Sequence, residues 1–201
     1  HNMGEIVDAL LAVIEKPETT VKELHRAIVK GPDFPTAGIL YGAAGILEAY
    51  ETGRGVVRIR ARAVFEKKKR TEDESVVITE IPYAVNKADL VKQIAELVHD
   101  KKIEGISDIR DESNREGVRV VIELKRGAVP DVILNQLYAS TRMELSFGIQ
   151  MLAIVNGQPQ ILNLRQMLDL FLDFRKEVVT RRTRYELKKA LERLHILEGL
   201  V

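Results

Sequence analysis

Arginine recurs at every second position between residues 58 and 62 of this chain. Side chains alternate between the two faces of a β-strand, so Arg58, Arg60 and Arg62 would share one face of an extended segment. Their spacing along that face, roughly 6.6–6.8 Å, is close to the spacing of phosphates along one strand of a duplex. The pattern predicts a surface that binds a polyanion, and the DNA backbone is the favoured candidate.

Arg54 precedes this row in the sequence Thr52-Gly53-Arg54-Gly55. The two glycines allow a tight turn and a close approach of the backbone to a ligand. Residues 54–70 contain eight Lys or Arg and one acid, Glu66. The alternative interpretation is an edge strand that its charges protect from aggregation, and both interpretations stay open. The opposite face of the strand over residues 56–65 would pack on a core through Val57, Ile59, Ala61, Ala63 and Phe65.

Two further basic features are weaker candidates for DNA binding. Lys87 follows Asn86, which is a favourable N-cap residue, and a helix dipole at this position would add to the positive charge of Lys87. The segment from Arg175 to Lys189 holds seven Lys or Arg against Glu177 and Glu186. For that segment a solvated helix face is favoured over a DNA contact.

No pattern in the chain predicts catalysis or a metal site. His25, His99 and His195 are far apart and lack the spacing of metal ligands. Gly42-Ala43-Ala44-Gly45 lacks the Lys-Ser/Thr of a phosphate-binding P-loop and indicates a strand-to-helix turn instead. The acids between residues 108 and 112 are only a weak metal signal. We therefore expect no catalytic residue, no metal ligand and no cofactor in this segment.

Composition limits the classes of protein that the chain can represent. It has 201 residues, of which 45% are hydrophobic and 30% charged, with a net charge of +1, so any nucleic-acid role rests on local patches. The absence of cysteine excludes a disulfide framework and fits a reducing compartment, and we expect a cytoplasmic location. No apolar run approaches the roughly 18–20 residues that span a bilayer, so no membrane partner is expected.

The predicted elements divide the chain into four parts. Strand patterns and amphipathic helices alternate through the middle, which predicts an α/β (α+β) fold with a mixed sheet covered by helices. Thr20 with Glu23 forms a capping box, and Pro130 is suited to a first helical position. The parts are residues 1–4, which look like a tag remnant, 5–30, a helical lead-in, 31–162, the α/β domain, and 163–201, a long coiled-coil helix.

The last part of the chain predicts one long helix. Between residues 163 and 201 there is no proline and no glycine before Gly199, and apolar residues recur at intervals of three and four. Such a helix would be roughly 55 Å long at 1.5 Å per residue. One small domain cannot cover that length, so the pattern indicates a coiled coil with a partner helix.

Taken together, blocks in the same order over nearly the whole chain resemble the A subunit of bacterial DNA gyrase, a type IIA topoisomerase, and its close paralogue in topoisomerase IV. The blocks are Gly31-Pro-Asp-Phe-Pro-Thr36, Tyr50-Glu-Thr-Gly-Arg-Gly55, Glu80-Ile-Pro-Tyr-Ala-Val-Asn-Lys87, Glu104-Gly-Ile-Ser107, Arg110-Asp-Glu-Ser113, Ser146-Phe-Gly148, Arg181-Arg-Thr183 and His195-Ile-Leu-Glu-Gly-Leu200.

This resemblance implies a tower domain followed by the start of the coiled-coil helix that leads to the exit gate. The family's A subunit binds a gate duplex, cuts both strands through a tyrosine ester and passes a second duplex through the break. The implied partners in an A2B2 assembly are double-stranded DNA, a second A subunit and a gyrase B-type ATPase subunit. Mg²⁺ and ATP would act through that ATPase partner, and the implied location is nucleoid-associated.

The family's nucleophile stands in an Arg-Tyr-Thr context that we do not assign to this chain, since Arg184-Tyr185-Glu186 is only a superficial echo on the long helix. We therefore expect the segment to be inactive alone. Two classes of function remain open: a DNA-positioning part of a topoisomerase, either gyrase or topoisomerase IV, and a non-catalytic helical scaffold with an α/β spacer.

Overall fold

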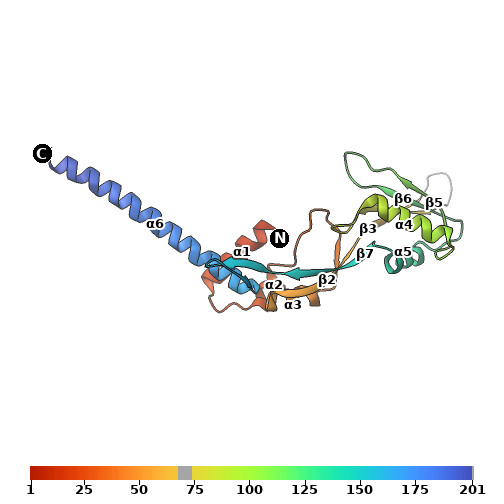
Figure 1. Ribbon diagram of the computed structural model, residues 1–201, viewed down its shortest axis with the longest axis horizontal. Coiled ribbons are helices and arrows are strands. Elements are labelled where there is room, and N and C mark those ends of the chain that lie inside the picture. The colour runs from red at the N-terminus through yellow and green to blue at the C-terminus, as the bar shows by residue number, and fades with distance from the viewer. Residues whose placement is uncertain (68–73, 201) are drawn as a thin grey trace.

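We describe a computed structural model of the chain over residues 1–67 and 74–200. The molecule is elongated, with two bodies joined by the strands β2 and β7 and a long helix that projects from one end (Figure 1). The helices of the described residues are α1 (Met3–Glu15), α2 (Val21–Ala27), α3 (Ala44–Thr52), α4 (Lys87–His99), α5 (Pro130–Ser140) and α6 (Leu164–Glu198). The strands are β1 (Ile39–Tyr41), β2 (Arg54–Arg60), β3 (Arg62–Lys67), β4 (Glu74–Glu80), β5 (Ile106–Asp111), β6 (Val120–Leu124), β7 (Glu144–Gln150), β8 (Leu152–Val155) and β9 (Gln158–Ile161).

The described strands form three antiparallel sheets. A three-stranded sheet in the order β1-β2-β7, here the stem sheet, belongs to the body that carries α1, α2 and α3. A four-stranded sheet in the order β3-β4-β6-β5, here the head sheet, belongs to the body that carries α4 and α5. β8 and β9 form a separate two-stranded hairpin. The expected α/β class with a long C-terminal helix is confirmed.

Each body has its own hydrophobic core. In the head, α4 and α5 cover one face of the head sheet, and Leu90, Ile94 and Leu137 are fully buried against it. In the stem, Tyr50 of α3 is packed with Ile59 of β2 and with residues of α1 and the start of α6. Two separate cores explain why the molecule is extended, because the apolar surface of each body is buried locally.

Several local signals produce the elements that they predict. The Thr20 side chain accepts from Glu23 N–H, and the Glu23 carboxylate accepts from Thr20 N–H at 2.7 Å, so the capping box starts α2 as expected. Asn86 caps α4 through Ala88 N–H and Asp89 N–H. Strand β7 was not predicted, and it is the strand that pairs with β2 along its whole length.

The prediction of one continuous strand over residues 56–65 is wrong. The chain leaves the stem sheet at Ala61, and β3 continues in the head sheet, with a register shift at Arg62 and Ala63. Two hydrogen bonds stabilise the backbone at this break. Ala61 N–H donates to Met143 O at 2.7 Å, and the Tyr138 hydroxyl donates to Ala61 O at 2.8 Å.

The break changes what the second half of the predicted strand does. Phe65 is 45% exposed in β3, whereas we expected it to pack on the core shared with Val57 and Ile59. The charged run over residues 66–75 predicts a solvated hairpin loop after this strand. The loop is shorter than that, because β3 extends to Lys67 and β4 begins at Glu74, and these two residues form an ion pair of 3.0 Å. Residues 68–73 of that predicted loop lie outside the described residues.

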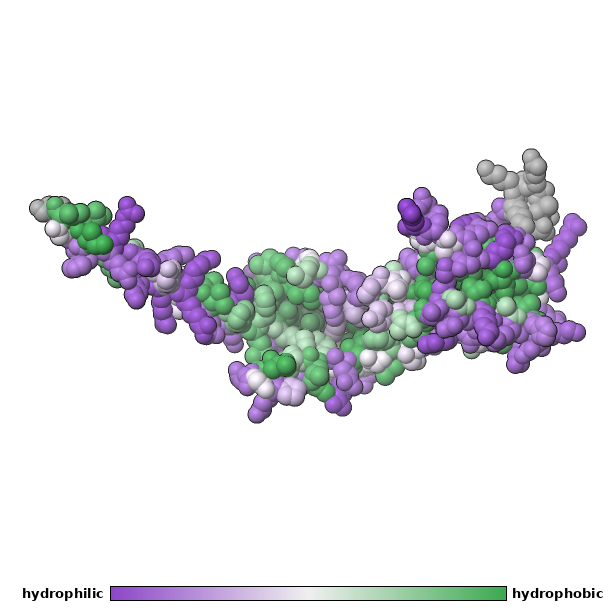
Figure 2. Space-filling view, turned by 45° about the horizontal axis from the view of Figure 1, so that its top comes forward, coloured by the Kyte–Doolittle hydropathy of each residue, from purple (hydrophilic) through white to green (hydrophobic). Residues whose placement is uncertain are grey.

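Helix α6 is anchored only at its first turns. Asn163 caps it in a box with Gln166, and Leu164 and Leu168 are buried in the stem core. Every residue from 179 to 200 is exposed. Figure 2 shows hydrophilic residues over most of the projecting helix and hydrophobic residues again at its far end. The predicted long helix is confirmed, and its length beyond the body leaves its apolar stripe uncovered within the described chain.

Candidate nucleic-acid interface

The stem sheet has one open face. On β2 the exposed positions alternate with buried ones, so Arg54, Val56, Arg58 and the half-buried Arg60 lie on the face opposite to Val57 and Ile59. Residues directly opposite in an antiparallel ladder share a face. The pairs on the open face are Arg54 with Gln150, Val56 with Gly148, Arg58 with Ser146, Arg60 with Glu144, Ile39 with Arg60 and Tyr41 with Arg58. We call this set the arginine face.

Arg58 and Arg60 share one carboxylate and one aromatic ring. Arg58 Nη1 lies 3.3 Å from Glu144 Oε1, and Arg60 Nε contacts the other Glu144 oxygen. Both guanidinium groups also lie over the Tyr41 ring, at 4.8 Å for Arg58 and 3.7 Å for Arg60. One carboxylate balances only one of the two cations, so the cluster keeps a positive charge.

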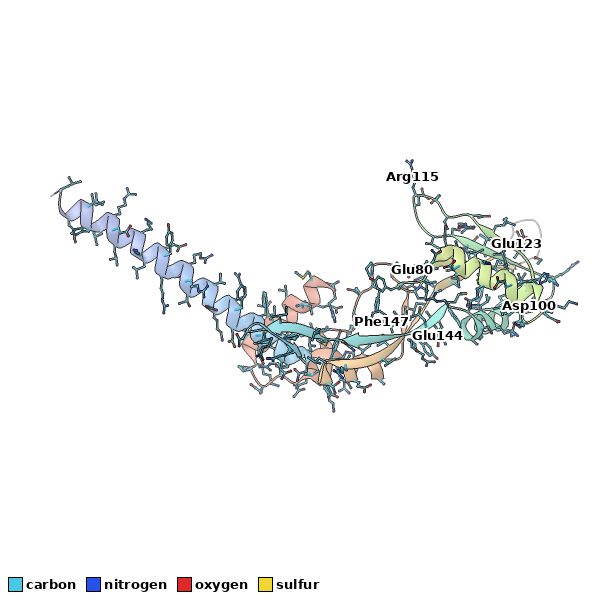
Figure 3. The ribbon with its side chains drawn as sticks, in the orientation of Figure 1. Glu80, Asp100, Arg115, Glu123, Glu144 and Phe147 are labelled. Carbon is cyan, nitrogen blue, oxygen red and sulfur yellow. The ribbon has the colours of Figure 1, made fainter. Side chains whose placement is uncertain are left out.

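Arg60 is also held from the head. Its guanidinium lies 4.7 Å from the centre of the Tyr138 ring, on α5, and its side chain is only 24% exposed, compared with 52% for Arg58. Burial raises the pKa of Tyr138, so its hydroxyl stays protonated and donates to Ala61 O. Arg60 therefore packs at the junction of the two bodies, and Arg58 is the better presented of the pair. Figure 3 labels Glu144 at this junction.

Arg62 lies beyond the strand break and belongs to a different contact. Its Nε lies 3.0 Å from Glu80 Oε2, and the same carboxylate oxygen accepts from Gly38 N–H at 2.8 Å. Burial raises the pKa of Glu80, but the Gly38 and Arg62 hydrogen bonds outweigh it, so the net pKa is lowered and Glu80 stays charged. Arg62 is thus not part of one uninterrupted row with Arg58 and Arg60, although its side chain is half exposed.

Arg54 has the freest guanidinium of the predicted set. It follows Gly53, which caps α3 with a positive φ of 80°, and its backbone N–H donates to Thr52 Oγ1 at 3.2 Å. Gly55 faces α3, where an added Cβ would clash with Gly45 O, so this glycine serves close packing as much as ligand approach. Among residues 1–67 and 74–200, no ion pair or hydrogen bond engages the Arg54 guanidinium.

Lys87 is at the first position of α4, as predicted, but it is engaged within the head. Its Nζ lies 2.7 Å from Asp111 Oδ2. The Lys87 ammonium and the Ser113 hydrogen bonds lower the pKa of Asp111 to about 2. This ion pair ties the start of α4 to the end of β5, so Lys87 is away from the arginine face and its charge is largely compensated.

The structure thus brings Arg54, Arg58 and Arg60 onto one face and separates Arg62 and Lys87 from it. Sequence reasoning missed Tyr41 and Glu144, which hold the arginines. Tyr41 reaches them because β1 pairs with β2, and Glu144 because β7 pairs with β2, and neither pairing had been predicted. A period-two pattern exists there, since Glu144, Ser146 and Gly148 alternate with more apolar neighbours, but it is weak.

Three further features concern metal binding, His25 and the membrane. Within the described parts of the chain, no group of three His, Cys, Asp or Glu is placed to hold a metal ion. His25 Nδ1 lies 3.1 Å from Val29 O, which is a local contact with the backbone. None of the described helices combines the length and the apolar character that crossing a membrane requires.

Comparison of the sequence with known proteins places the chain in a family. The sequence model of the family described as the DNA gyrase/topoisomerase IV A subunit matches residues 1–201. The chain is 59% identical to the DNA gyrase A subunit of Pseudomonas aeruginosa, with 99% of the chain and 22% of the relative aligned. It is 53% identical to the protein of the same name from Clostridium acetobutylicum, with 100% and 24% aligned, and 54% identical to that of Helicobacter pylori, with 99% and 24% aligned.

These matches define the class of protein as a type IIA topoisomerase subunit. The chain belongs to the family of the DNA gyrase/topoisomerase IV A subunit. It spans between a fifth and a quarter of the length of the relatives named above. The resemblance inferred from the sequence blocks is therefore confirmed at the level of the family.

Proposed function

We propose that this chain is a DNA-positioning part of the A subunit of a type IIA topoisomerase and that the arginine face holds the arms of the gate duplex. The observation that carries the proposal is the open face of the stem sheet, on which Arg54 and Arg58 are exposed and one carboxylate, Glu144, is shared by Arg58 and Arg60. Phosphate contacts from such cations position a duplex without reading its sequence.

Bending is the second part of the proposed role. A smooth bend in a short duplex costs on the order of 1–6 kcal/mol, and contacts on the DNA arms must offset that cost. The molecule is elongated, and cations lie along the sheet whose strands join its two bodies. This arrangement is suited to contact such an arm. Arg58 and Arg54 are the proposed phosphate ligands, Arg62 is a secondary one, and Arg60 and Lys87 are assigned to internal contacts.

Helix α6 is proposed to link this DNA-binding body to the exit gate. Its exposed apolar stripe would be covered by a partner helix of a coiled coil. In the whole enzyme the partners would be a second A subunit and a B-type ATPase subunit in an A2B2 assembly, with ATP and Mg²⁺ acting through the ATPase partner, in the cytoplasm at the nucleoid. The reaction would be ATP-dependent double-strand passage, with negative supercoiling in a gyrase and decatenation in a topoisomerase IV.

The test of this role uses the intact subunit in complex with its ATPase partner. Arg54→Ala combined with Arg58→Ala should weaken binding of a gate duplex and reduce its bend, measured by energy transfer between dyes at the duplex ends. Strand cleavage on DNA that is already bound should persist. An unchanged bend would mean that the arginine face is only a solvated edge of the sheet, and it would favour the scaffold interpretation.

The chain by itself should be inactive. We expect that it neither relaxes nor cleaves supercoiled DNA when the ATPase partner, ATP and Mg²⁺ are added, because no nucleophilic tyrosine is assigned to it. A gel assay of supercoiled plasmid measures both activities. Cleavage that depends on Tyr185 would contradict this expectation.

A further inference from the structure

Val56 is an apolar residue at the centre of the arginine face. Its side chain is 61% exposed, and on the same face of β2 it stands between Arg54 and Arg58. Its partner across the ladder is Gly148, where an added Cβ would meet no atom within 4 Å. The middle of the face is therefore apolar, and it is lowered at Gly148, where no side chain projects. Arg54 and Arg58 lie on either side of it along β2.

The spacing of Arg54 and Arg58 is compatible with two orientations of a duplex on the face. Arg54 and Arg58 are four residues apart, which is about 13–14 Å along an extended strand. Two phosphates of a single DNA strand that have one further phosphate between them are at a similar separation. Opposing phosphates are also about 12 Å apart across the minor groove of B-DNA, whose width between phosphate surfaces is about 6 Å.

Val56 distinguishes between these two orientations. If the face followed a single DNA strand, Val56 would lie against the charged phosphate between the two bound ones and would exclude water from it without offering a hydrogen bond. If the face crossed the minor groove, Val56 would lie against the apolar edges of the deoxyriboses, where minor-groove proteins place apolar side chains. The low backbone at Gly148 would give the groove edges room to approach.

The two borders of the face differ in rigidity. Arg58 is held by Glu144 at 3.3 Å and by the Tyr41 ring at 4.8 Å, so its guanidinium has a fixed position. Arg54 has no such contact among the described residues, so it is able to adjust to the distance of the second phosphate strand. A fixed cation and an adjustable one suit a groove whose width varies with sequence.

We propose that the arginine face straddles the minor groove of the duplex, with Arg58 and Arg54 on phosphates of opposite strands and Val56 against the sugar edges between them. This inference rests on the proposed function and specifies which part of the DNA the same site takes. It implies that groups which project into the minor groove weaken binding, whereas groups in the major groove do not.

The experiment compares the binding of the intact protein to three duplexes. One is unmodified, one carries 2,6-diaminopurine in place of adenine, which adds an amino group to the minor groove, and one carries 5-methylcytosine, which adds a methyl group to the major groove. The added minor-groove amine should weaken binding by the wild-type protein about fivefold, or about 1 kcal/mol, and 5-methylcytosine should have no effect. Val56→Ala should fold normally, because the residue is exposed, and should reduce the penalty for diaminopurine.

The matched variants separate this inference from the proposed function. If the diaminopurine penalty is absent, or is the same in Val56→Ala as in wild type, the straddling geometry is wrong. In that case the variant Arg54→Ala with Arg58→Ala still tests the proposed function. If this variant flattens the slope of log affinity against log salt, the face binds DNA but follows one DNA strand. If the arginine variants also leave the salt dependence unchanged, both proposals fail.

Discussion

At the scale of single residues, Arg58 and Arg60 lie on the same face but have different roles. Arg60 is three-quarters buried between Tyr41 and Tyr138 and shares Glu144, whereas Arg58 is half exposed with the same two stem partners. A guanidinium packed between aromatic rings contributes through contact and cation–π attraction as well as charge. The chemistry of a residue type thus does not determine its role, because burial decides it.

We expect Arg60→Ala to destabilise the fold and Arg58→Ala to leave stability nearly unchanged. The loss should be about 1–2 kcal/mol for Arg60→Ala, since packing and ring contacts are removed together. For Arg58→Ala it should be within about 0.5 kcal/mol, since exposed ion pairs contribute little. Urea unfolding of both variants measures the difference, and equal losses would contradict the assignment of Arg60 to the junction.

A second prediction at this scale concerns pH and the Lys87–Asp111 ion pair. The pKa of Asp111 is depressed to about 2 in the folded chain, from an ordinary value near 3.9, so its contribution is complete above the ordinary value and is lost as the pH falls through the folded value. Asp111→Asn should therefore be less stable than wild type at pH 7. The difference should shrink between about pH 5 and pH 2. Thermal unfolding across this range measures it, and a difference that stays constant would exclude the ionic contribution.

At the scale of elements, the decisive feature is the break at Ala61. Each polar group of the broken backbone is satisfied, the N–H by Met143 O and the carbonyl by the Tyr138 hydroxyl. Unpaired backbone groups at a buried position would carry a large desolvation cost. The break is thus a hydrogen-bonded junction at which the chain crosses from the stem sheet to the head sheet.

Tyr138→Phe tests that junction. It removes only the hydroxyl, leaves Ala61 O without its donor and should lower the free energy of unfolding by about 1 kcal/mol. Proton exchange of the Ala61 amide should also become faster if the ends of the two strands separate more often. An unchanged stability together with unchanged exchange would mean that the hydroxyl bond is not needed for the break.

Sequence patterns anticipated those elements that have local causes. The capping box of α2, the N-cap of α4 and the long helix α6 follow from neighbours within four residues. The break at Ala61 depends on Tyr138 and Met143, which are distant in sequence, so no period-two pattern contains it. The pairing of the arginines with Glu144 likewise depends on the register of β7, which the weak alternation of that strand did not specify.

At the scale of the whole molecule, two compact bodies and one projecting helix make an extended object (Figure 1). Each body buries its own core, and the stem sheet, whose strands β2 and β7 join the two bodies, exposes the arginine face. Extension favours a role in which one body contacts a long ligand while α6 reaches a distant partner. The family membership and this shape are consistent with the proposed positioning of a duplex.

The most direct test of the central claim is the salt dependence of duplex binding by this chain. Wild type is compared with Arg54→Ala plus Arg58→Ala and with a control of equal charge change, Lys92→Ala plus Lys102→Ala, which alters exposed lysines on and just after α4. Each lost phosphate contact should flatten the slope of log affinity against log salt by about one unit, so the arginine variant should lose about two units and the lysine control none. Equal slopes for wild type and the arginine variant would contradict the claim that this face binds DNA.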